Sequence, residues 1–256
     1  MTGTGDSARR FSNRVVDYVR YRPGYPDALF DWLHDEQGVP HDALVADIGA
    51  GTGIATLAWL RRGHPVIAVE PNAAMREALV AGLAGEPGLR TLDGSAEATG
   101  LEAASVDLVA SAQAFHWFDP DATRREWARI LRPGGLACVF WNSRLATASP
   151  FLRDYEALLH AYGEDYGRVA ERHPDDAAMR TWFGAGFRAM ARFAHARPLD
   201  FEALRGRLRS SSSTPPPGDP RHAPMLAGLR RVFDKHAEQG MIRFDYLTRV
   251  FVGTLH

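Results

Sequence analysis

The residues with the clearest chemical meaning are two acidic side chains that flank a glycine-rich turn. Asp47 lies just before the glycines at positions 49, 51 and 53, and Glu70 follows a second short apolar run. Closely spaced glycines after a β-branched run predict a strand, a tight turn and a helix N-terminus. Glycine suits such a turn because, without a Cβ, its backbone takes positive φ angles and lets a ligand approach closely. We therefore expect a ligand-binding turn between the two carboxylates.

The spacing of these residues indicates the kind of ligand. Glu70 lies 21 residues beyond Gly49, where the second strand of a nucleotide-binding α/β unit presents a carboxylate to ribose hydroxyls. The dinucleotide-binding pattern has its third glycine where this chain has Ile54, and Asp47 suits an ammonium group better than a pyrophosphate. S-adenosylmethionine has a cationic amino acid end and an adenosine end, so it fits both carboxylates.

Five short motifs, in this order, resemble those of the class I S-adenosylmethionine-dependent methyltransferases. They are DIGAGTG at 47–53, EPNAAM at 70–75, GSAE at 94–97, VDLV at 106–109 and LRPGG at 131–135. Residues 18–26 and 112–118 also look like the small-molecule subgroup related to trans-aconitate methyltransferase. The resemblance implies an α/β fold, a doubly wound, Rossmann-like and mostly parallel seven-stranded sheet. A C-terminal antiparallel edge strand and a helical cap would complete it.

The resemblance also implies which residues bind the cofactor. The glycine turn would hold the methionine carboxylate, Glu70 the ribose and Met75 the adenine face. Ser95 stands where the family often has aspartate, so its hydroxyl would accept from the adenine amino group instead. The full expected set is Tyr18, Arg22, Asp47, Gly49, Ala50, Gly51, Thr52, Gly53, Glu70, Pro71, Asn72, Met75, Ser95, Ala96, Glu97, Gln113 and Ala114. No metal ligand is expected.

Several of these residues also have a simpler structural interpretation. A methionine at helical spacing often fills a core, so Met75 is either core or adenine cover. Asp47 either anchors an ammonium group or caps the turn, and Glu70 is either a ribose ligand or a solvated strand end. Glu97 is either a ligand contact or a surface carboxylate. These alternatives stay open at the level of sequence.

The N-terminal segment, residues 1–26, resembles a lid that closes over the cofactor. Its aromatic residues include Tyr18, Tyr21 and Tyr25, and Arg22 among them is able to pair with a carboxylate of cofactor or substrate. The alternative is a polar amphipathic helix that ends before the proline at position 23.

His116 is the candidate catalytic residue. Methyl transfer is an in-line displacement whose leaving thioether needs no proton, so the main task is to position the acceptor and exclude water. A histidine with an ordinary pKa near 6.5 serves as general base when an alcohol or acidic carbon must lose a proton. A carboxylate acceptor needs no base, and His116 would then be a structural hydrogen-bonding group at the pocket wall.

Hydrophobic patterning places these motifs in alternating strands and helices, which predicts a parallel sheet. Strands are expected at 43–48, 66–69, 90–92, 106–111, 136–141, 192–199 and 242–252. Helices are expected at 27–36, 52–62, 71–83, 122–131, 150–162, 175–183, 200–209 and 224–239. Within a single domain, 1–256, residues 40–142 would form the cofactor-binding core, and 143–256 the cap helices and C-terminal strands. The serine- and proline-rich run at 210–218 is either a surface loop or a substrate gate.

Composition limits the class of protein and its partners. The 256 residues suit one domain with a substantial core, and the formal net charge of −1 favours neither nucleic acid nor membrane. The single cysteine excludes an internal disulfide. Residues 1–11 lack the apolar stretch of a leader peptide, and no run is long enough to span a membrane. We expect a cytoplasmic protein with a small-molecule substrate, its oligomeric state unknown.

The sequence therefore predicts a methyltransferase that acts on a small molecule, with the oxygen of a carboxylate or hydroxyl as the expected acceptor. A dehydrogenase would need a pyrophosphate turn, against which Asp47 and Gly53 argue. A nucleic-acid methyltransferase would need a basic face with stacking aromatics. A protein methyltransferase and a non-catalytic S-adenosylmethionine-binding homologue remain alternatives, because a fold and a cofactor motif do not prove turnover.

Overall fold

The computed structural model describes residues 21–163, 166, 174–211 and 213–255, so Tyr18 and most of the expected lid lie outside it. The strands are β1 (Val45–Ile48), β2 (Val66–Val69), β3 (Leu89–Leu92), β4 (Val106–Ala112), β5 (Leu131–Arg144), β6 (Phe187–Leu199) and β7 (Ile242–Gly253). The helices are α3 (Asp27–Asp35), α4 (Ile54–Leu60), α5 (Ala73–Gly82), α6 (Pro120–Ile130), α7 (Pro150–Tyr162), α9 (Asp176–Phe183), α10 (Phe201–Arg209) and α11 (His222–His236). Two short 3₁₀ turns, η1 (Phe115–Trp117) and η2 (Gly184–Gly186), join them.

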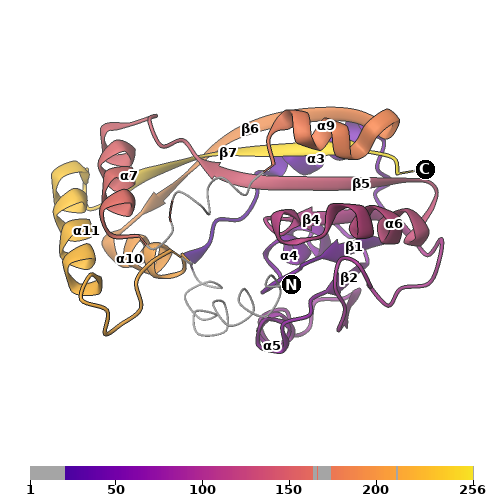
Figure 1. Cartoon of the computed structure of the whole chain (residues 1–256), viewed down its shortest axis with the longest axis horizontal. Helices are drawn as coiled ribbons and strands as arrows, with labels where there is room; N and C mark the ends of the chain where they lie inside the picture. Colours follow the sequence, from indigo (N-terminus) through magenta and orange to yellow (C-terminus); the bar gives the residue numbers. More distant parts are fainter. Residues whose placement is uncertain (1–20, 164–165, 167–173, 212, 256) are drawn as a thin grey trace.

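The strands form one seven-stranded sheet with the order β3-β2-β1-β4-β5-β7-β6 (Figure 1). Strands β1 to β5 are parallel to one another, and β7 is antiparallel to both β5 and β6. The order reverses between β1 and β4, as it does in doubly wound sheets. The predicted mostly parallel α/β fold is confirmed.

Two apolar clusters cover the faces of the sheet. Helices α3, α4 and α5 pack on one face, and α6 and α9 pack on the other. In β1, Val45 lies in the first cluster and Ala46 and Ile48 in the second, so the alternation turns Asp47 toward α4. All four residues are buried, which explains why the strand is a continuous apolar run interrupted only by the aspartate.

The C-terminal strand β7 corrects one expectation. It pairs antiparallel with β5 as predicted, but it does not form the edge of the sheet, because β6 covers its other side. The β6–β7 pairing runs from Phe187 opposite Gly253 to Leu199 opposite Ile242. A pattern of alternating apolar residues identifies the strand but does not say which neighbour it acquires.

Strand β5 begins earlier than the strand expected at 136–141, so the proline and glycines of the LRPGG motif lie inside it. Leu131 already pairs with Val106, and the register shifts before Leu136 meets Leu108. Gly134, with a φ of 82°, lies in the exposed excursion between these pairs. The proline and glycines therefore interrupt the pairing of β5 without ending the strand.

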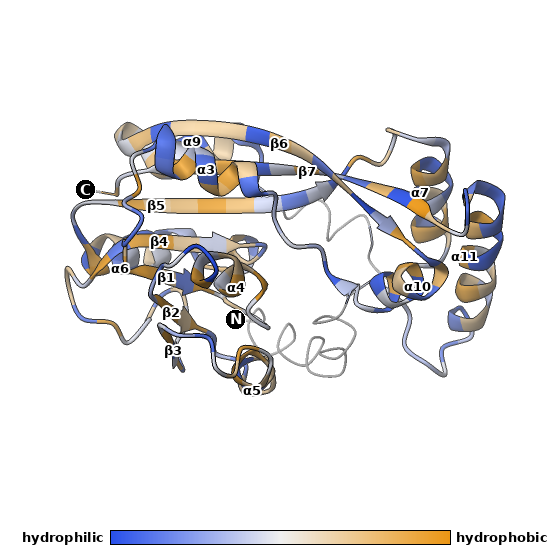
Figure 2. Ribbon diagram, turned by 180° about the vertical axis from the view of Figure 1, so that it is seen from behind, coloured by the Kyte–Doolittle hydropathy of each residue, from blue (hydrophilic) through white to orange (hydrophobic). Residues whose placement is uncertain are grey.

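Helices α7, α10 and α11 form a cap on the far ends of β6 and β7 (Figure 1). Phe244 of β7 is fully buried there, stacked on Tyr246 and edge-on to Phe151 and Tyr155. In Figure 2, β5 is apolar where it crosses the core and becomes polar as it nears the cap. The apolar part of β5 therefore lies in the core of the sheet, and its polar part lies between that core and the cap.

The expectation of a surface loop at 210–218 is wrong for the first half of that run. Ser210, Ser213 and Thr214 are buried, and among the described residues of this run only those from 216 to 218 are exposed. The hydroxyls of Ser210 and Thr214 donate to carbonyl oxygens in the last turn of α10, at 2.7 and 2.6 Å. Polar side chains are buried here because they satisfy the free end of a helix.

Among the described helices, none is both long and apolar enough to cross a bilayer.

Replacement of Phe244 by alanine tests whether the cap is a packed core of its own. We expect Phe244→Ala to lower the free energy of unfolding by about 3–5 kcal/mol, because it leaves a cavity among three aromatic rings. Urea titration measures the loss, and Val80→Ala, at a side chain that is 49% exposed, is the control. A loss below about 1 kcal/mol would contradict the packing described here.

Candidate functional site

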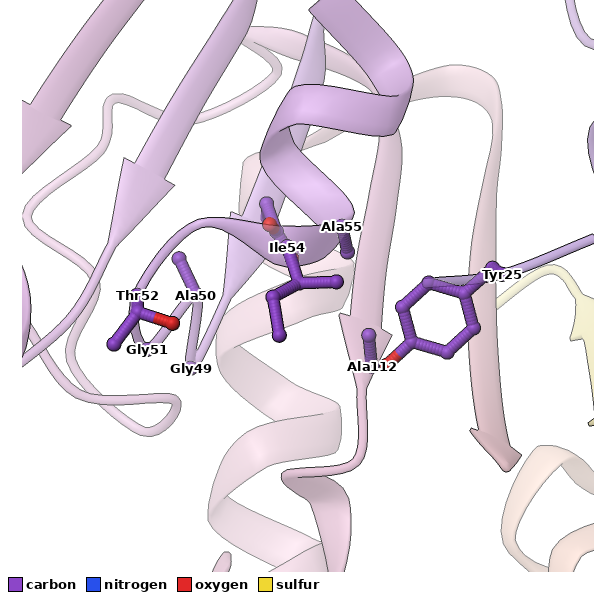
Figure 3. Close-up of a pocket in the computed structure, with 9 residues that line it drawn as sticks. Tyr25, Gly49, Ala50, Gly51, Thr52, Ile54, Ala55 and Ala112 are labelled. Atoms are coloured by element: carbon purple, nitrogen blue, oxygen red, sulfur yellow. The ribbon is translucent and has the colours of Figure 1, made fainter. Parts of the chain in front are cut away.

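A pocket lies at the carboxyl ends of β1 and β4, where the strand order reverses and where open α/β sheets bind their ligands. It encloses about 310 Å³ of space that is partly open to solvent. Its lining consists of Tyr25, Asp47, Gly49, Ala50, Gly51, Thr52, Ile54, Ala55 and Ala112. Figure 3 shows the glycine turn on one side, Tyr25 and Ala112 on the other, and the side chain of Ile54 between them.

Asp47 is the buried charge of this pocket. Its Oδ2 accepts a hydrogen bond from the Thr56 hydroxyl at 2.6 Å, whereas its buried Oδ1 has no partner in the described part of the chain. Burial raises the pKa of the Asp47 carboxyl to about 6, and the nearby Glu70 adds to the rise, while the bond from Thr56 opposes it. A buried carboxylate oxygen without a donor is the complement of a cationic ligand group.

The glycine turn combines tight packing with an open side. A Cβ on Gly53 would lie 2.9 Å from the side chains of Leu79 and Leu83, so only glycine lets α5 approach the turn. A Cβ on Gly51 would meet nothing closer than the Met75 sulfur, at 3.8 Å. Both glycines have positive φ, of 86° and 58°. The backbone at Gly51 is therefore accessible to a ligand, while Gly53 has a packing role.

Glu70 holds this turn in place. It is 8% exposed, and its two oxygens accept from the backbone N–H groups of Gly51 and Asn72, each at 2.9 Å. Burial raises its pKa, and these two amide bonds oppose the rise. Because an ionised carboxylate has about four acceptor positions, two of them are left to receive the hydroxyls of a diol.

The residues after Glu70 form the start of α5. The Asn72 side chain caps the helix by accepting from the Met75 amide at 3.1 Å, and Pro71 precedes it. Met75 is 5% exposed and its sulfur lies beside Gly51. Met75 is therefore able to fill the core and to contact a ligand at the glycine turn.

The segment from Ser95 to Glu97 lies outside the lining of this pocket. The Ser95 hydroxyl accepts from the Ala98 amide at 3.2 Å, and Ala96 is buried in the core. Glu97 accepts from the Asp119 amide at 3.0 Å, just before α6. The polar contacts of this segment therefore close turns on its own side of the sheet.

Gln113 and Ala114 continue from β4 over the pocket. Gln113 has a φ of 60°, which is uncommon for a residue with a side chain, and its amide nitrogen donates to the Asn142 carbonyl at 3.0 Å. The Ala114 Cβ would lie 2.6 Å from a Cβ on Gly49. A strained residue and a close approach of two loops at the same strand end are typical of functional sites.

His116 lies in η1, and its Nδ1 accepts from the Trp141 indole N–H at 3.4 Å. An indole nitrogen only donates, so a neutral His116 ring in this arrangement carries its proton on Nε2. Trp141 belongs to the apolar cluster on the α6 and α9 face, opposite to the face that Asp47 points to. This contact favours a structural or orienting role for His116 over that of a base.

The described part of the expected lid runs from the cap to the pocket. A guanidinium nitrogen of Arg22 donates to the Ser210 carbonyl at 2.8 Å, and the Asn142 amide donates to the Gly24 carbonyl at 2.9 Å. Tyr25 then packs edge-on against Phe140, at 4.7 Å between ring centroids, and lines the pocket. Arg22 therefore contacts the cap loop in this structure.

Five pocket residues were not in the expected cofactor-binding set: Tyr25, Ile54, Ala55, Ala112 and, behind the lining, Thr56. Thr56 lies in the first turn of α4, and the need of Asp47 for a donor is the signal that would have identified it. The apolar lining residues carry no such signal.

Comparisons with known proteins agree with this geometry. A family profile described as a methyltransferase domain matches residues 46–139. An uncharacterised methyltransferase of Schizosaccharomyces pombe is 31% identical over 208 residues, which is 80% of this chain and 79% of the relative. An uncharacterised methyltransferase of Mycobacterium tuberculosis is 43% identical over 140 residues, 54% of each chain, so the match spans about half the length of the mycobacterial relative.

Solved structures show the same fold. A protein from Anaeromyxobacter dehalogenans assigned as a type II methyltransferase superimposes with a TM-score of 0.68 at 24% identity, covering 92% of this chain and 98% of the other. A second protein, YcgJ from Bacillus, superimposes with a TM-score of 0.52 at 20% identity, with coverages of 88% and 98%.

Replacement of Asp47 tests the charge of the pocket. Because its pKa of about 6 lies above the ordinary 3.8, the ionised carboxylate destabilises the folded chain, and this cost appears as the pH rises through that interval. We expect Asp47→Asn to raise the free energy of unfolding at pH 8 by about 1–3 kcal/mol, but to change it little below pH 4.

Urea titrations at the two pH values measure this difference. Asp31→Asn, at an exposed carboxylate of α3, is the control and should leave stability within about 0.5 kcal/mol of wild type. An Asp47→Asn variant that is less stable than wild type at pH 8 would show that the buried charge is satisfied within the protein.

Proposed function

The chain belongs to the class I S-adenosylmethionine-dependent methyltransferases, and we propose that it methylates an oxygen atom of a small molecule. The observation that carries this proposal is the buried Asp47 Oδ1, which has no donor among the residues that the structure describes and lies beside a glycine turn with an open backbone. The acceptor oxygen belongs to a carboxylate or a hydroxyl group.

The residues of the pocket fit this cofactor. Asp47 would pair with its ammonium group, the amides of the glycine turn with its carboxylate, and Glu70 with the ribose hydroxyls. Met75 would cover the adenine beside Gly51. Ser95 and Ala96 are proposed to recognise the adenine edge; neither is among the residues that line the pocket.

When bound, S-adenosylmethionine supplies a methyl group on a sulfonium sulfur, and the transfer forms a carbon–oxygen bond as the carbon–sulfur bond breaks. The protein's contribution is to hold the acceptor oxygen in line and to keep water away. Tyr25, Ala112 and the loop of Gln113 surround the strand ends where that oxygen must lie. Residues 1–26 would complete the enclosure as a lid, in keeping with the path of the segment from Arg22 to Tyr25.

A small acceptor is favoured over a macromolecule because the cap stands beside the pocket. Arg22 is hydrogen-bonded to the Ser210 loop, and Asn142 is hydrogen-bonded to Gly24. These contacts leave less room for a large acceptor at the carboxyl ends of the strands. Transfer of a labelled methyl group to pools of metabolites, RNA and protein tests the proposal. Labelling confined to RNA or protein would contradict it, and binding of S-adenosylhomocysteine without any transfer would favour a non-catalytic homologue.

Replacement of Glu70 tests the ribose assignment. We expect Glu70→Ala to weaken binding of S-adenosylhomocysteine by about 1.5–3 kcal/mol, because hydrogen bonds to a charged group and the anchor of the glycine turn are lost. Calorimetric titration measures the affinity, and Glu77→Ala, at an exposed carboxylate of α5, should leave it unchanged. Near-unchanged affinity in Glu70→Ala would exclude this assignment.

Replacement of His116 by asparagine separates its two roles. As an orienting group, His116 is replaceable, because the asparagine carbonyl is able to accept from Trp141, and we expect turnover to stay within about tenfold of wild type. As a general base, its loss would lower turnover by roughly 10²–10⁴-fold. The rate of the intact enzyme would then also rise with pH, because only the neutral imidazole accepts a proton.

The measurement is a pH–rate profile of wild type and His116→Asn with an acceptor found by the labelling experiment. A fall beyond a hundredfold, together with the disappearance of the ascending limb, would assign His116 as the base.

A further inference from the structure

Segments that are far apart in the chain meet at one residue of β5, Asn142. Its side chain is only 9% exposed, and its backbone pairs with Thr248 of β7. The alternation of the strand puts this side chain on the same face of the sheet as Phe140, which packs against the pocket residue Tyr25. A buried amide so close to a ligand pocket raises the question of what it holds in place.

The partners of the Asn142 amide fix its orientation. The Gly24 backbone carbonyl only accepts, so the atom 2.9 Å from it is the amide nitrogen, which donates. The Oδ1 atom accepts from the Thr248 hydroxyl at 2.6 Å and lies 3.2 Å from the His195 Nε2. Burial lowers the pKa of His195, so at pH 7 its ring is neutral and donates its proton on Nε2. Two donors on the oxygen therefore keep the nitrogen turned toward Gly24.

The segment that this nitrogen holds forms part of the pocket wall. Residues 22–26 lie outside the described helices and strands, so contacts with other segments determine where they lie. Tyr25 follows the bonded Gly24 directly, and its ring packs edge-on against Phe140. Figure 3 shows this ring beside Ala112, across the pocket from the glycine turn. Holding the Gly24 carbonyl therefore restricts the positions that the Tyr25 ring is able to take.

The backbone of Asn142 holds a second part of the pocket. Pairing of β4 with β5 ends where Ala112 lies opposite Phe140, and beyond that point the Asn142 carbonyl accepts from the Gln113 side-chain amide at 3.0 Å. This bond supports a residue whose φ of 60° is costly. The next residue, Ala114, approaches Gly49 so closely that a Cβ there would lie 2.6 Å from its own. One residue thus supports both the Tyr25 segment and the loop after β4.

We propose that Asn142 is a positioning residue for methyl transfer, in that its side-chain amide holds the Gly24 carbonyl and thereby keeps the Tyr25 ring over the pocket. This inference rests on the proposed function. Displacement at a sulfonium requires the acceptor to be held in line and water to be excluded, so a ring that moves freely slows it. Asn142 is not among the residues that line the pocket, and it therefore acts through its neighbours.

Replacement of Asn142 by aspartate tests the bond without changing the shape of the side chain. Asn142→Asp keeps an oxygen for Thr248 and His195 but places a second oxygen opposite the Gly24 carbonyl. We expect the complete chain to bind S-adenosylhomocysteine about fivefold to thirtyfold less tightly, because the enclosed arrangement is populated for only part of the time. Calorimetric titration measures the affinity.

Three further variants separate this effect from others. Asn142→Leu adds no charge and should weaken binding in the same way. Ser143→Ala is the matched control, because the Ser143 side chain lies on the other face of β5, and it should leave the affinity unchanged. Thr248→Val keeps the donor to Gly24 but loses one donor to the Asn142 oxygen, so its effect should be smaller. Unchanged affinity in both Asn142 variants would overturn the proposal. If those variants do not fold, unchanged affinity in Thr248→Val would overturn it.

The position of the Tyr25 ring supplies a spectroscopic readout. In protein with labelled tyrosine and phenylalanine rings, we expect nuclear Overhauser effects between Tyr25 and Phe140 in the wild type and their loss in Asn142→Asp. Those between Phe244 and Tyr246, which stack 5.0 Å apart in the cap, should persist and show that the variant is folded. Tyr25–Phe140 effects that keep their full strength in Asn142→Asp would overturn the proposal.

Turnover with an acceptor found by the labelling experiment distinguishes positioning from mere stabilisation of the fold. Asn142→Asp should lower kcat by a larger factor than it raises KM for the acceptor, because the group it displaces orders the reacting state. An unchanged kcat per folded molecule would reduce Asn142 to a structural residue and overturn the proposal. Failure of the wild-type chain to bind S-adenosylhomocysteine would instead contradict the proposed function.

Discussion

The half-satisfied carboxylate of Asp47 is the constraint around which the pocket is built. Taking a carboxylate out of water is costly, and here one oxygen receives the Thr56 hydroxyl while the other has no donor among the described residues. Close approach of a cationic group requires a turn without side chains, which Gly51 provides. The turn itself must be held in place, and the Glu70 carboxylate does so by accepting a hydrogen bond from the Gly51 amide. Each of these features follows from keeping a buried charge ready for a ligand.

The strands on the two sides of the sheet differ in length and in the part of the protein that they reach. Strands β1 to β4 are short, and β1 and β4 end at the pocket. Strands β5, β6 and β7 are longer, and β6 and β7 reach the cap helices (Figure 1). Along β5, the side chains change from apolar at Phe140 to polar at Asn142 and Arg144. The pocket and the cap are therefore attached to different strands, and Asn142 lies between them, bonded to Gln113 and to Gly24.

Local sequence patterns predicted the features that depend on residues close together in the chain or on the regular geometry of a parallel sheet. The glycine spacing located the turn, and the position of Glu70 one strand later placed it against Gly51, because parallel strands end at a common edge. Periodicity located every described strand and long helix to within a few residues, apart from the early starts of β5 and β6. The position of β7, the burial of the Ser210 loop and the bond between Trp141 and His116 depend on contacts between distant segments. No local pattern encodes those partners, so the structure was needed to reveal them.

The place of β7 between β5 and β6 also constrains the order in which the protein can assemble. Among the described strands, β6 pairs with β7 alone, although α10 and α11 separate the two along the chain. During synthesis, the parallel part from β1 to β5 therefore has all of its strands before β6 gains a partner. Until β7 arrives, the long side of β5 presents unpaired backbone groups, which are a template for association with other chains. Closing that edge brings together segments far apart in sequence, so completion of the sheet is the slow, entropically expensive part of folding.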